Sequence, residues 1–222
     1  MKKVIIFGST GMIGQAVLLE CLEDNRIAEV LLVNRTTCGI KHPKIKEVLH
    51  NDFYNFSSIA NQFMGYNACL FCLGITSVGL SEQEYHKITY EIGVAAAEAM
   101  LSVNSNISVC YISGAGTDST ERGRTMWARV KGKLENKLIA MPFKGAYMFR
   151  PGYIQPLKGI KSKTNWYQFF YIILKPLYFL LKPFKSFVTD SVTLSKAMIN
   201  AGLEGYSKKV LEVKDINAIR KC

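Results

Sequence analysis

Residues 4–14 read Val4-Ile5-Ile6-Phe7-Gly8-Ser9-Thr10-Gly11-Met12-Ile13-Gly14, and this segment settles which class of structure the chain adopts. It opens with four consecutive apolar residues, which is typical of a strand buried on both faces of a parallel sheet. Three glycines follow at intervals of three, and residues 12–22 then show helical spacing of their apolar positions. A second apolar run, 30–33, completes a strand–turn–helix–strand unit of about thirty residues.

The same alternation continues along the chain. Further strands are expected near 46–49, 68–73, 107–112, 145–149 and 209–213, and helices over 83–101, 127–140 and 189–202. Strands that alternate with helices predict an α/β protein with a doubly wound parallel sheet, a Rossmann fold. We expect one domain over 1–222, in which residues 153–205 contribute a small helical lid over the strand ends.

Composition narrows the class of protein. Hydrophobic residues make up 49% of the 222 residues and charged residues 20%, which excludes a disordered or low-complexity chain. Six cysteines lie mostly in apolar runs, and the pair Cys69 and Cys72 falls in a predicted strand whose alternation sends the two thiols to opposite faces. We therefore expect neither a disulfide framework nor a metal site. No apolar secretory segment follows Met1, and we predict a cytoplasmic location.

Basic residues gather toward the C-terminus. The net charge is +11, of which +8 falls in residues 151–222. Aromatic and basic residues are dense over 165–187, but their apolar runs are too short to span a bilayer. This segment could roof a pocket, bury a homodimer interface or contact an anionic membrane surface. Because its aromatics are flanked by aliphatic residues, we do not expect nucleic-acid binding.

The glycine turn predicts a dinucleotide site. Such a site needs a turn too tight for a Cβ, a backbone that can touch pyrophosphate, and a helix packed close to its strand. Gly8, Gly11 and Gly14 can supply these features, although their spacing differs from the G-x-G-x-x-G fingerprint. The predicted cofactor contacts of this turn are Gly8, Ser9, Thr10, Gly11, Met12, Ile13 and Gly14.

The end of the second strand bears on which nicotinamide dinucleotide is preferred. NAD sites usually place a carboxylate there for the ribose hydroxyls, whereas this chain has Asn34 and Arg35. A guanidinium can pair with a 2′-phosphate and stack on adenine, so we predict NADP(H) over NAD(H). The alternative is a solvated surface arginine. Asp52 and Phe53, just past the third strand, are expected beside the adenine, with a helix cap as the alternative for Asp52.

The chain resembles the atypical short-chain dehydrogenase/reductase group, in its Tat-interacting-protein-like branch of NAD(P)H-binding proteins. The resemblance covers nearly the whole chain. It is carried by the glycine turn, by Ser113 after the fifth strand, by Val130-Lys131-Gly132-Lys133-Leu134-Glu135 and by Phe149-Arg150-Pro151-Gly152.

The resemblance implies a catalytic set made of a Tyr-x-x-x-Lys pair and an upstream serine. Lys131 matches the lysine and Ser113 the serine, but Trp127 stands where the tyrosine is expected. An indole N–H donates a hydrogen bond and cannot shuttle a proton near neutral pH, which puts the standard mechanism in doubt. Trp127 could instead be a wall of the substrate pocket or a core residue, and Tyr153 could supply the proton. The alternatives for Lys131 and Ser113 are a solvated helix lysine and a turn residue.

The resemblance also implies that the loops after the fourth and sixth strands line the cofactor, through Leu73, Gly74, Pro151 and Gly152. We expect an NADP-dependent oxidoreductase acting on a small carbonyl or alcohol, as a monomer or homodimer. Lys131 and Ser113 would polarise the carbonyl while water gives the proton. The alternative is a non-catalytic NADPH-dependent sensor or interaction protein, which includes the case of a protein peripheral to a membrane.

Overall fold

The apolar runs of the sequence become the strands of a parallel sheet. The computed structural model describes residues 1–159 and 187–219, and within them seven strands pair in the order β3-β2-β1-β4-β5-β6-β9. Every pairing in this sheet is parallel. The strands are β1 (Lys2–Phe7), β2 (Ile27–Asn34), β3 (Ile45–Leu49), β4 (Ala68–Phe71), β5 (Ser108–Ile112), β6 (Gly145–Arg150) and β9 (Val210–Glu212).

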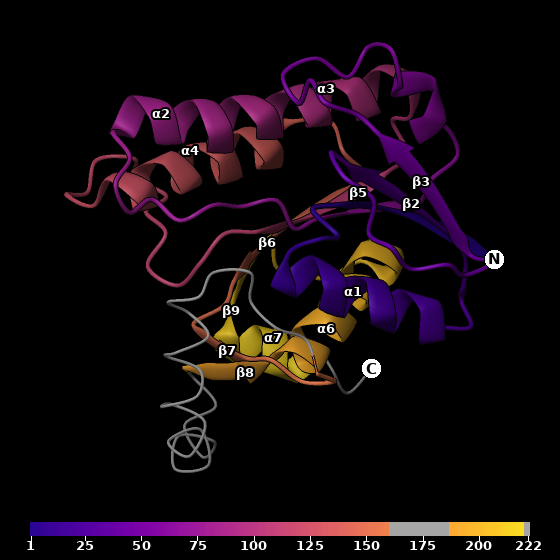
Figure 1. Cartoon of the computed structure of the whole chain (residues 1–222). Coiled ribbons are helices and arrows are strands. Elements are labelled where there is room, and N and C mark those ends of the chain that lie inside the picture. Colours follow the sequence, from indigo (N-terminus) through magenta and orange to yellow (C-terminus); the bar gives the residue numbers. More distant parts are fainter. Residues whose placement is uncertain (160–186, 220–222) are drawn as a thin grey trace.

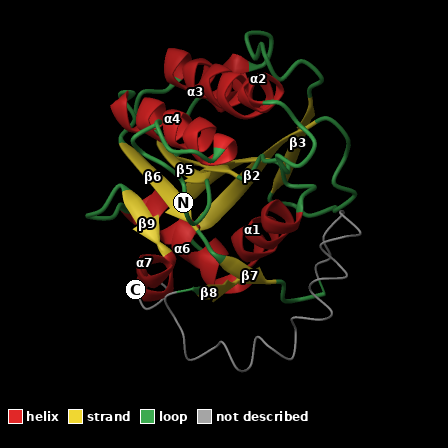
Figure 2. Cartoon of the chain, turned by 90° about the vertical axis from the view of Figure 1, so that its left-hand side faces the viewer, coloured by secondary structure: helices red, strands yellow, loops and turns green. Residues whose placement is uncertain are grey.

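Helices cover both faces of the sheet and give three layers (Figure 1, Figure 2). One layer holds α1 (Met12–Glu23), α6 (Ser191–Glu204) and α7 (Val213–Ile219). The other holds α2 (Glu82–His86), α3 (Ile92–Val103) and α4 (Met126–Ala140). A π-helical turn over Lys87–Glu91 joins α2 to α3, so the helix predicted over 83–101 is interrupted, and a short 3₁₀ helix, Ala60–Phe63, precedes β4. The doubly wound Rossmann fold predicted from the sequence is confirmed.

Two apolar cores lie on opposite faces of the sheet, one under each helix layer. Ile6 and Leu70 belong to the core shared with α1 and α6, whereas Ile5 and Cys69 belong to the core beneath α3 and α4. Cys72 packs against the first of these cores. The alternation predicted for Cys69 of β4 and Cys72 just after it is therefore confirmed, because the two thiols face opposite sides of the sheet.

The segment after β6 differs from the predicted lid. β7 (Tyr153–Gln155) and β8 (Val188–Asp190), which were not predicted, form a small parallel pair of their own. α6, although it falls within the predicted lid range 153–205, is buried beside α1 against β4, β5 and β6 of the sheet. Its apolar residues recur at helical spacing on the side that faces the core, which explains this position. Residues 160–186, which hold most of the aromatic segment 165–187, lie outside the described residues.

The carboxyl ends of the strands meet along one edge of the sheet. The chain runs from β1 through β2 to β3 on one side and then returns to β4 on the other side of β1. Open α/β sheets bind ligands at such a reversal, outside the carboxyl ends of the strands. In this chain the loops after β1, β2, β4, β5 and β6 surround that position and carry most of the predicted site residues; the others lie at the start of α1, after β3, on α4 and on β7.

Candidate functional site

The glycine turn between β1 and α1 is as tight as the sequence predicts. Gly8 has φ +80°, and a Cβ there would come within 3.0 Å of the Cys72 and Leu73 backbone. A Cβ on Gly14 would lie 2.0 Å from the Gly8 carbonyl oxygen, so glycine is needed for α1 to begin this close to β1. Gly11 differs from both, because a Cβ there would meet only the Gly8 oxygen, at 3.4 Å. The side of the turn at Gly11 is thus open to an approaching group.

The N-terminus of α1 is suited to an anion. Its N-cap is Gly11, and no side chain caps the helix and no acidic residue lies in the first turn, as far as the described residues show. The partial positive charge of the helix end is therefore not offset by a neighbouring carboxylate. Together with the open side of Gly11, this geometry fits a pyrophosphate held by backbone N–H groups. Ser9 is fully buried, and the Thr10 carbonyl accepts a hydrogen bond from Gln15 Nε2 at 3.3 Å.

A polar network links the glycine turn to the end of β2. Ser9 Oγ donates to Asn34 Oδ1 at 2.9 Å, and Asn34 Nδ2 donates to Glu47 Oε1 at 2.8 Å. Glu47 also accepts hydrogen bonds from Thr37 Oγ1 at 2.6 Å and from the Cys38 N–H at 2.8 Å. Sequence reasoning missed Glu47; the available signal was an acid placed among the apolar residues Ile45, Val48 and Leu49 of one strand.

Arg35 and Phe53, which were each predicted to contact the cofactor, lie together beside this network. The exposed Arg35 guanidinium lies over the Phe53 ring, 5.9 Å from its centroid. His50 packs its ring against Phe53, with the centroids 6.1 Å apart. Asp52 is exposed and accepts a hydrogen bond from the Tyr54 N–H at 3.0 Å, so its side chain forms a turn rather than a helix cap. A cation over an aromatic ring at this edge is suited to an adenine and a phosphate group.

Leu73 and Gly74, which follow β4, lie on the other side of the glycine turn. The Leu73 N–H would be 3.0 Å from a Cβ on Gly8, which shows how closely the two loops approach. The Cys72 N–H donates to the Phe7 carbonyl at 3.0 Å, so the pairing of β1 and β4 continues to this edge. Gly74 is exposed, and a Cβ there would meet nothing within 4 Å. The loop after β4 therefore presents its backbone to a space that a ligand can enter.

Ser113 and Lys131 are brought together at the end of β5. Lys131 Nζ donates to the Ser113 carbonyl oxygen at 2.5 Å. The buried Ser113 hydroxyl donates to Glu135 Oε1 at 2.5 Å and also approaches the Phe149 carbonyl at 3.1 Å. Its one hydrogen is engaged within the protein, because a serine hydroxyl carries a single proton. Ser113 thus holds Lys131 through its backbone while its own side chain points to Glu135.

Glu135 is the second residue that sequence reasoning left without a role. Its side chain is fully buried and pairs with Arg150 through two bonds, 3.0 Å from Nε and 2.5 Å from Nη2. Arg150 also reaches Ser119 Oγ at 2.5 Å and Glu212 at 3.4 Å. The signal was available: Glu135 lies four residues after Lys131, between the apolar positions Leu134 and Leu138 of a helix.

Burial changes the proton affinity of Lys131. Desolvation lowers the pKa of Lys131 to about 8, and the nearby Glu135 carboxylate opposes the shift only in part. A half-buried ammonium with a pKa near neutrality is a group able to donate a hydrogen bond or a proton to a bound ligand. The solvated-lysine alternative considered for Lys131 does not match this position.

Trp127 lies one turn before Lys131 on α4. Its ring lies over the loop after β5: a Cβ on Gly114 or on Gly116 would be 3.8 Å from the indole. The side chain is half-buried. Tyr153, on β7, donates its hydroxyl to Gln155 Oε1 at 2.9 Å. Pro151 is buried at the end of β6, and its carbonyl accepts from the Ala115 N–H at 2.8 Å, which ties the loops after β5 and β6 together.

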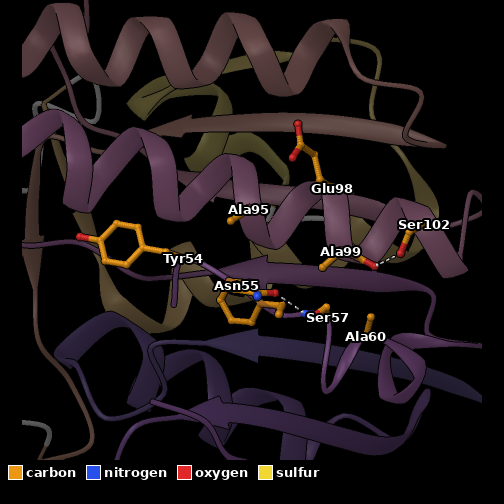
Figure 3. A pocket seen from close by; sticks show the side chains of 9 residues that line it. Tyr54, Asn55, Ser57, Ala60, Ala95, Glu98, Ala99 and Ser102 are labelled. Atoms are coloured by element: carbon orange, nitrogen blue, oxygen red, sulfur yellow. Dashed lines mark hydrogen bonds between the residues drawn. The ribbon is translucent and has the colours of Figure 1, made fainter. Parts of the chain in front are cut away.

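A separate cavity of about 300 Å³ lies between the segment after β3 and α3 (Figure 3). Ala95, Glu98 and Ala99 line it from α3, and Tyr54 lines it from the segment after β3. Asn55 Oδ1 accepts from the Ser57 N–H at 2.9 Å within it. No lining residue of this cavity is among those predicted for the dinucleotide site.

Comparison with known proteins identifies distant relatives. Protein FMP52 of Meyerozyma guilliermondii is 26% identical over 151 residues, which span 68% of this chain and 64% of that protein. FMP52-1 of Scheffersomyces stipitis is 23% identical, and the match spans 97% of both chains. HTATIP2 of Rattus norvegicus is 25% identical over 68% of this chain and 62% of its own length. The match thus covers just under two thirds of the first and third of these relatives. No protein-family model matches the chain.

Solved structures share the fold at low sequence identity. A short-chain dehydrogenase/reductase from Saccharomyces cerevisiae superposes with a TM-score of 0.66 at 14% identity and covers 99% of this chain and 98% of its own. WbmF of Bordetella bronchiseptica, solved in complex with NAD⁺, superposes with a TM-score of 0.70 at 12% identity, over 99% of this chain and 78% of its own. With the named relatives, these structures confirm the resemblance to the atypical short-chain dehydrogenase/reductase group.

The comparisons correct the predicted location. The FMP52 relatives are named as mitochondrial proteins, and this contradicts the cytoplasmic location predicted from the sequence. That prediction used only the lack of a secretory segment, which does not distinguish the cytoplasm from an organelle. Among the described residues, no helix has the length and apolar character needed to cross a bilayer.

Proposed function

We propose that the chain is an NADP(H)-binding oxidoreductase that acts on a small carbonyl or alcohol. The observation that carries the proposal is the glycine turn, where Gly8 and Gly14 let β1 and α1 approach while Gly11 leaves one side open. An uncapped helix N-terminus lies at the same place and suits the pyrophosphate. The chain's resemblance to short-chain dehydrogenases, one of them solved with NAD⁺, supports a nicotinamide cofactor.

The proposed preference for NADP(H) is supported by charge at the end of β2. Arg35 is exposed over Phe53, and the buried Asn34 occupies the position where a carboxylate would accept from the ribose. Glu47 is near, but hydrogen bonds from Asn34, Thr37 and Cys38 occupy three of the roughly four lone-pair sites of its carboxylate. A 2′-phosphate at this position would therefore pair with the Arg35 guanidinium.

The chemistry would depend on Lys131. Its ammonium lies at the carboxyl edge of the sheet, held by the Ser113 carbonyl, and has further N–H groups for a ribose or a substrate carbonyl. The bound dinucleotide would supply the hydride. Ser113, Glu135 and Arg150 fix the lysine in place, and water or Lys131 itself gives the proton that a phenol would give in the standard set.

The first test is a fluorescence titration of the purified chain with NADPH and NADH. We expect tighter binding of NADPH and a loss of that preference in Arg35→Glu, because a carboxylate would repel the 2′-phosphate and accept from a ribose hydroxyl. Equal affinities that Arg35→Glu leaves unchanged would contradict the 2′-phosphate assignment. Binding of neither nucleotide would overturn the proposal as a whole.

A second candidate function is a non-catalytic NADPH-dependent sensor. Two observations favour it: Trp127 stands in the place of the catalytic phenol, and the Ser113 proton is engaged by Glu135. Neither group can then give a proton to a substrate. The two functions are separated by incubation with NADPH and a panel of small aldehydes and ketones, since only an oxidoreductase consumes the cofactor.

A further inference from the structure

The loop that carries Arg35 is held by a residue from a different strand. Glu47 lies on β3 opposite Leu32 of β2, and its carboxylate reaches past the end of β2 into the loop. There it accepts three hydrogen bonds: from Asn34 Nδ2, which precedes Arg35, and from Thr37 Oγ1 and the Cys38 N–H, which follow it. The loop is thus fastened on both sides of Arg35.

The hydrogen-bond network that holds this loop extends into the glycine turn. Asn34 is buried, and its side-chain oxygen accepts from Ser9 Oγ at 2.9 Å while its amide donates to Glu47. The Asn34 carbonyl also accepts from the His50 N–H at 2.8 Å. The turn, the β2 loop and the segment after β3 therefore form one connected unit, and Glu47 is the group at which its bonds converge.

We infer that Glu47 is a positioning residue for dinucleotide specificity: by holding the 34–38 loop, it presents Arg35 toward the 2′ position of the adenosine ribose. The inference rests on the proposed function. Holding the loop before binding lowers the cost of ordering Arg35 when the nucleotide arrives. Burial raises the pKa of Glu47, but the hydrogen bonds from Thr37, Cys38 and Asn34 outweigh it, and the net shift is downward. The carboxylate is ionised at neutral pH and binds its three donors in that form.

The direction in which NADPH affinity changes when Glu47 is replaced distinguishes a positioning role from direct charge repulsion. A carboxylate near a 2′-phosphate repels it, so removal of the Glu47 charge alone would strengthen NADPH binding. A positioning role gives the opposite result, because Glu47→Gln replaces an acceptor by an amide N–H that faces other donors and loosens the loop. Binding of NADH, which lacks the 2′-phosphate, should change little whether Glu47 acts through its charge or by positioning the loop.

The test compares the ratio of the NADH Kd to the NADPH Kd in four proteins: the wild type, Glu47→Gln, Arg35→Ala and the double variant. We expect Glu47→Gln to lower the ratio about five- to tenfold, the equivalent of about one lost hydrogen bond. In the Arg35→Ala background the same substitution should have no further effect, because Glu47 acts through Arg35. Thermal unfolding shows that each variant is folded.

Glu29→Gln is the matched control. Like Glu47, Glu29 is half-buried; it binds Lys46 and Tyr66, but it lies toward the other end of β2. We expect its loss to leave the ratio unchanged. If Glu47→Gln does not fold, Thr37→Val removes one of the three bonds from the loop side and should lower the ratio in the same direction.

The outcomes separate the inference from the proposed function. A wild type that binds neither nucleotide overturns both. A wild type that binds NADPH and NADH equally, or an Arg35→Ala variant that keeps the preference, overturns the inference while nucleotide binding stands. A folded Glu47→Gln protein with an unchanged or increased ratio overturns the inference alone.

Discussion

Trp127 is the residue at which this chain departs most from the chemistry that its relatives suggest. The indole lies over Gly114 and Gly116, one helical turn before Lys131. A phenol there would extend from the same Cβ toward the same loop and would carry the proton that an indole cannot give. Lys131 of α4 and the Ser113 carbonyl that anchors it are already in place.

We predict that Trp127→Tyr increases the rate of NADPH-dependent carbonyl reduction. A positioned general acid contributes about 10²–10⁴-fold, and we expect at least a tenfold gain in a scaffold not otherwise adapted to it. The rate of NADPH oxidation with a panel of small aldehydes and ketones is the measurement. Trp127→Phe is the control, because it removes the indole without adding a hydroxyl. An equal gain in both variants would show that ring size, and not the proton, limits the rate.

Lys131 should give the stability of the protein a characteristic pH dependence. Burial lowers its pKa from 10.5 to about 8 in the folded chain. Between pH 8 and 10.5 the unfolded chain therefore holds a proton that the folded chain has released, so the free energy of unfolding rises with pH across this window. Below pH 8 Lys131 is protonated in both states, so it adds no pH dependence to the free energy of unfolding there.

The measurement is the difference in urea-unfolding free energy between the wild type and Lys131→Met as a function of pH. We expect the wild type to gain about 1–3 kcal/mol on the variant from pH 8 to 10.5. Lys137→Met, at an exposed position of the same helix, should show a flat difference. A flat difference for Lys131→Met as well would mean that the lysine is solvated.

The turn between β1 and α1 shows how one element serves both the fold and the site. Gly14 is required by contact, since its Cβ would lie 2.0 Å from the Gly8 oxygen. Gly11 has φ −84°, which any residue adopts, and its side of the turn is open. The two glycines therefore have separable roles, one in packing and one in leaving room for a ligand.

We predict different results for alanine at these two positions. Gly14→Ala should destabilise the protein by about 3 kcal/mol and weaken nucleotide binding, because α1 must move away from β1. Gly11→Ala should cost less than about 1 kcal/mol and yet weaken nucleotide binding at least tenfold, because the methyl group occupies the open side. Thermal unfolding and nucleotide titration of both variants give the comparison. Normal binding by a folded Gly11→Ala protein would place the pyrophosphate elsewhere.

A buried ion pair joins α4 to β6. Glu135 is fully buried and Arg150 is largely so, and removal of one partner from such a pair leaves an uncompensated charge.

We predict that Glu135→Gln lowers the free energy of unfolding by about 3 kcal/mol, measured by urea denaturation. Glu212→Gln is the control: Glu212 contacts the same guanidinium at 3.4 Å, but its side chain is 47% exposed, and less than about 1 kcal/mol should be lost. Similar losses in both would contradict the central role of Glu135.

For the molecule as a whole, the layered fold could be predicted because local patterns determine it. Continuous apolar runs mark buried parallel strands, and the helical period between them marks the crossovers. The tight turn at Gly8 followed from its place at the end of the first strand, whereas the contact of Arg35 with Phe53 was not predicted. The position of α6 did not follow, because a helix under the sheet and a helix over the strand ends show the same apolar period.

The part of the site that escaped prediction is the set of long-range polar contacts. Ser113, Glu135 and Arg150 are separated by 22 and 15 residues and meet only because β5, α4 and β6 are neighbours. Glu47 and the β2 loop meet for the same reason, across the pairing of β2 with β3. The sequence places each carboxylate among apolar residues, which marks it as unusual, but spacing along the chain does not tell which distant residues it contacts, so these two carboxylates had no predicted role.

The packing of α6 against α1 also determines how late in synthesis one face of the sheet can be covered. Arg26 Nη2, just after α1, donates to Asn200 Oδ1 on α6 at 2.7 Å, across 174 positions of the chain. During synthesis, the apolar face of the sheet that includes Ile6 and Leu70 has no cover from α6 until residues 191–204 have left the ribosome. The nascent chain therefore exposes this apolar surface until α6 has been synthesised, and exposed apolar surface of this kind favours aggregation.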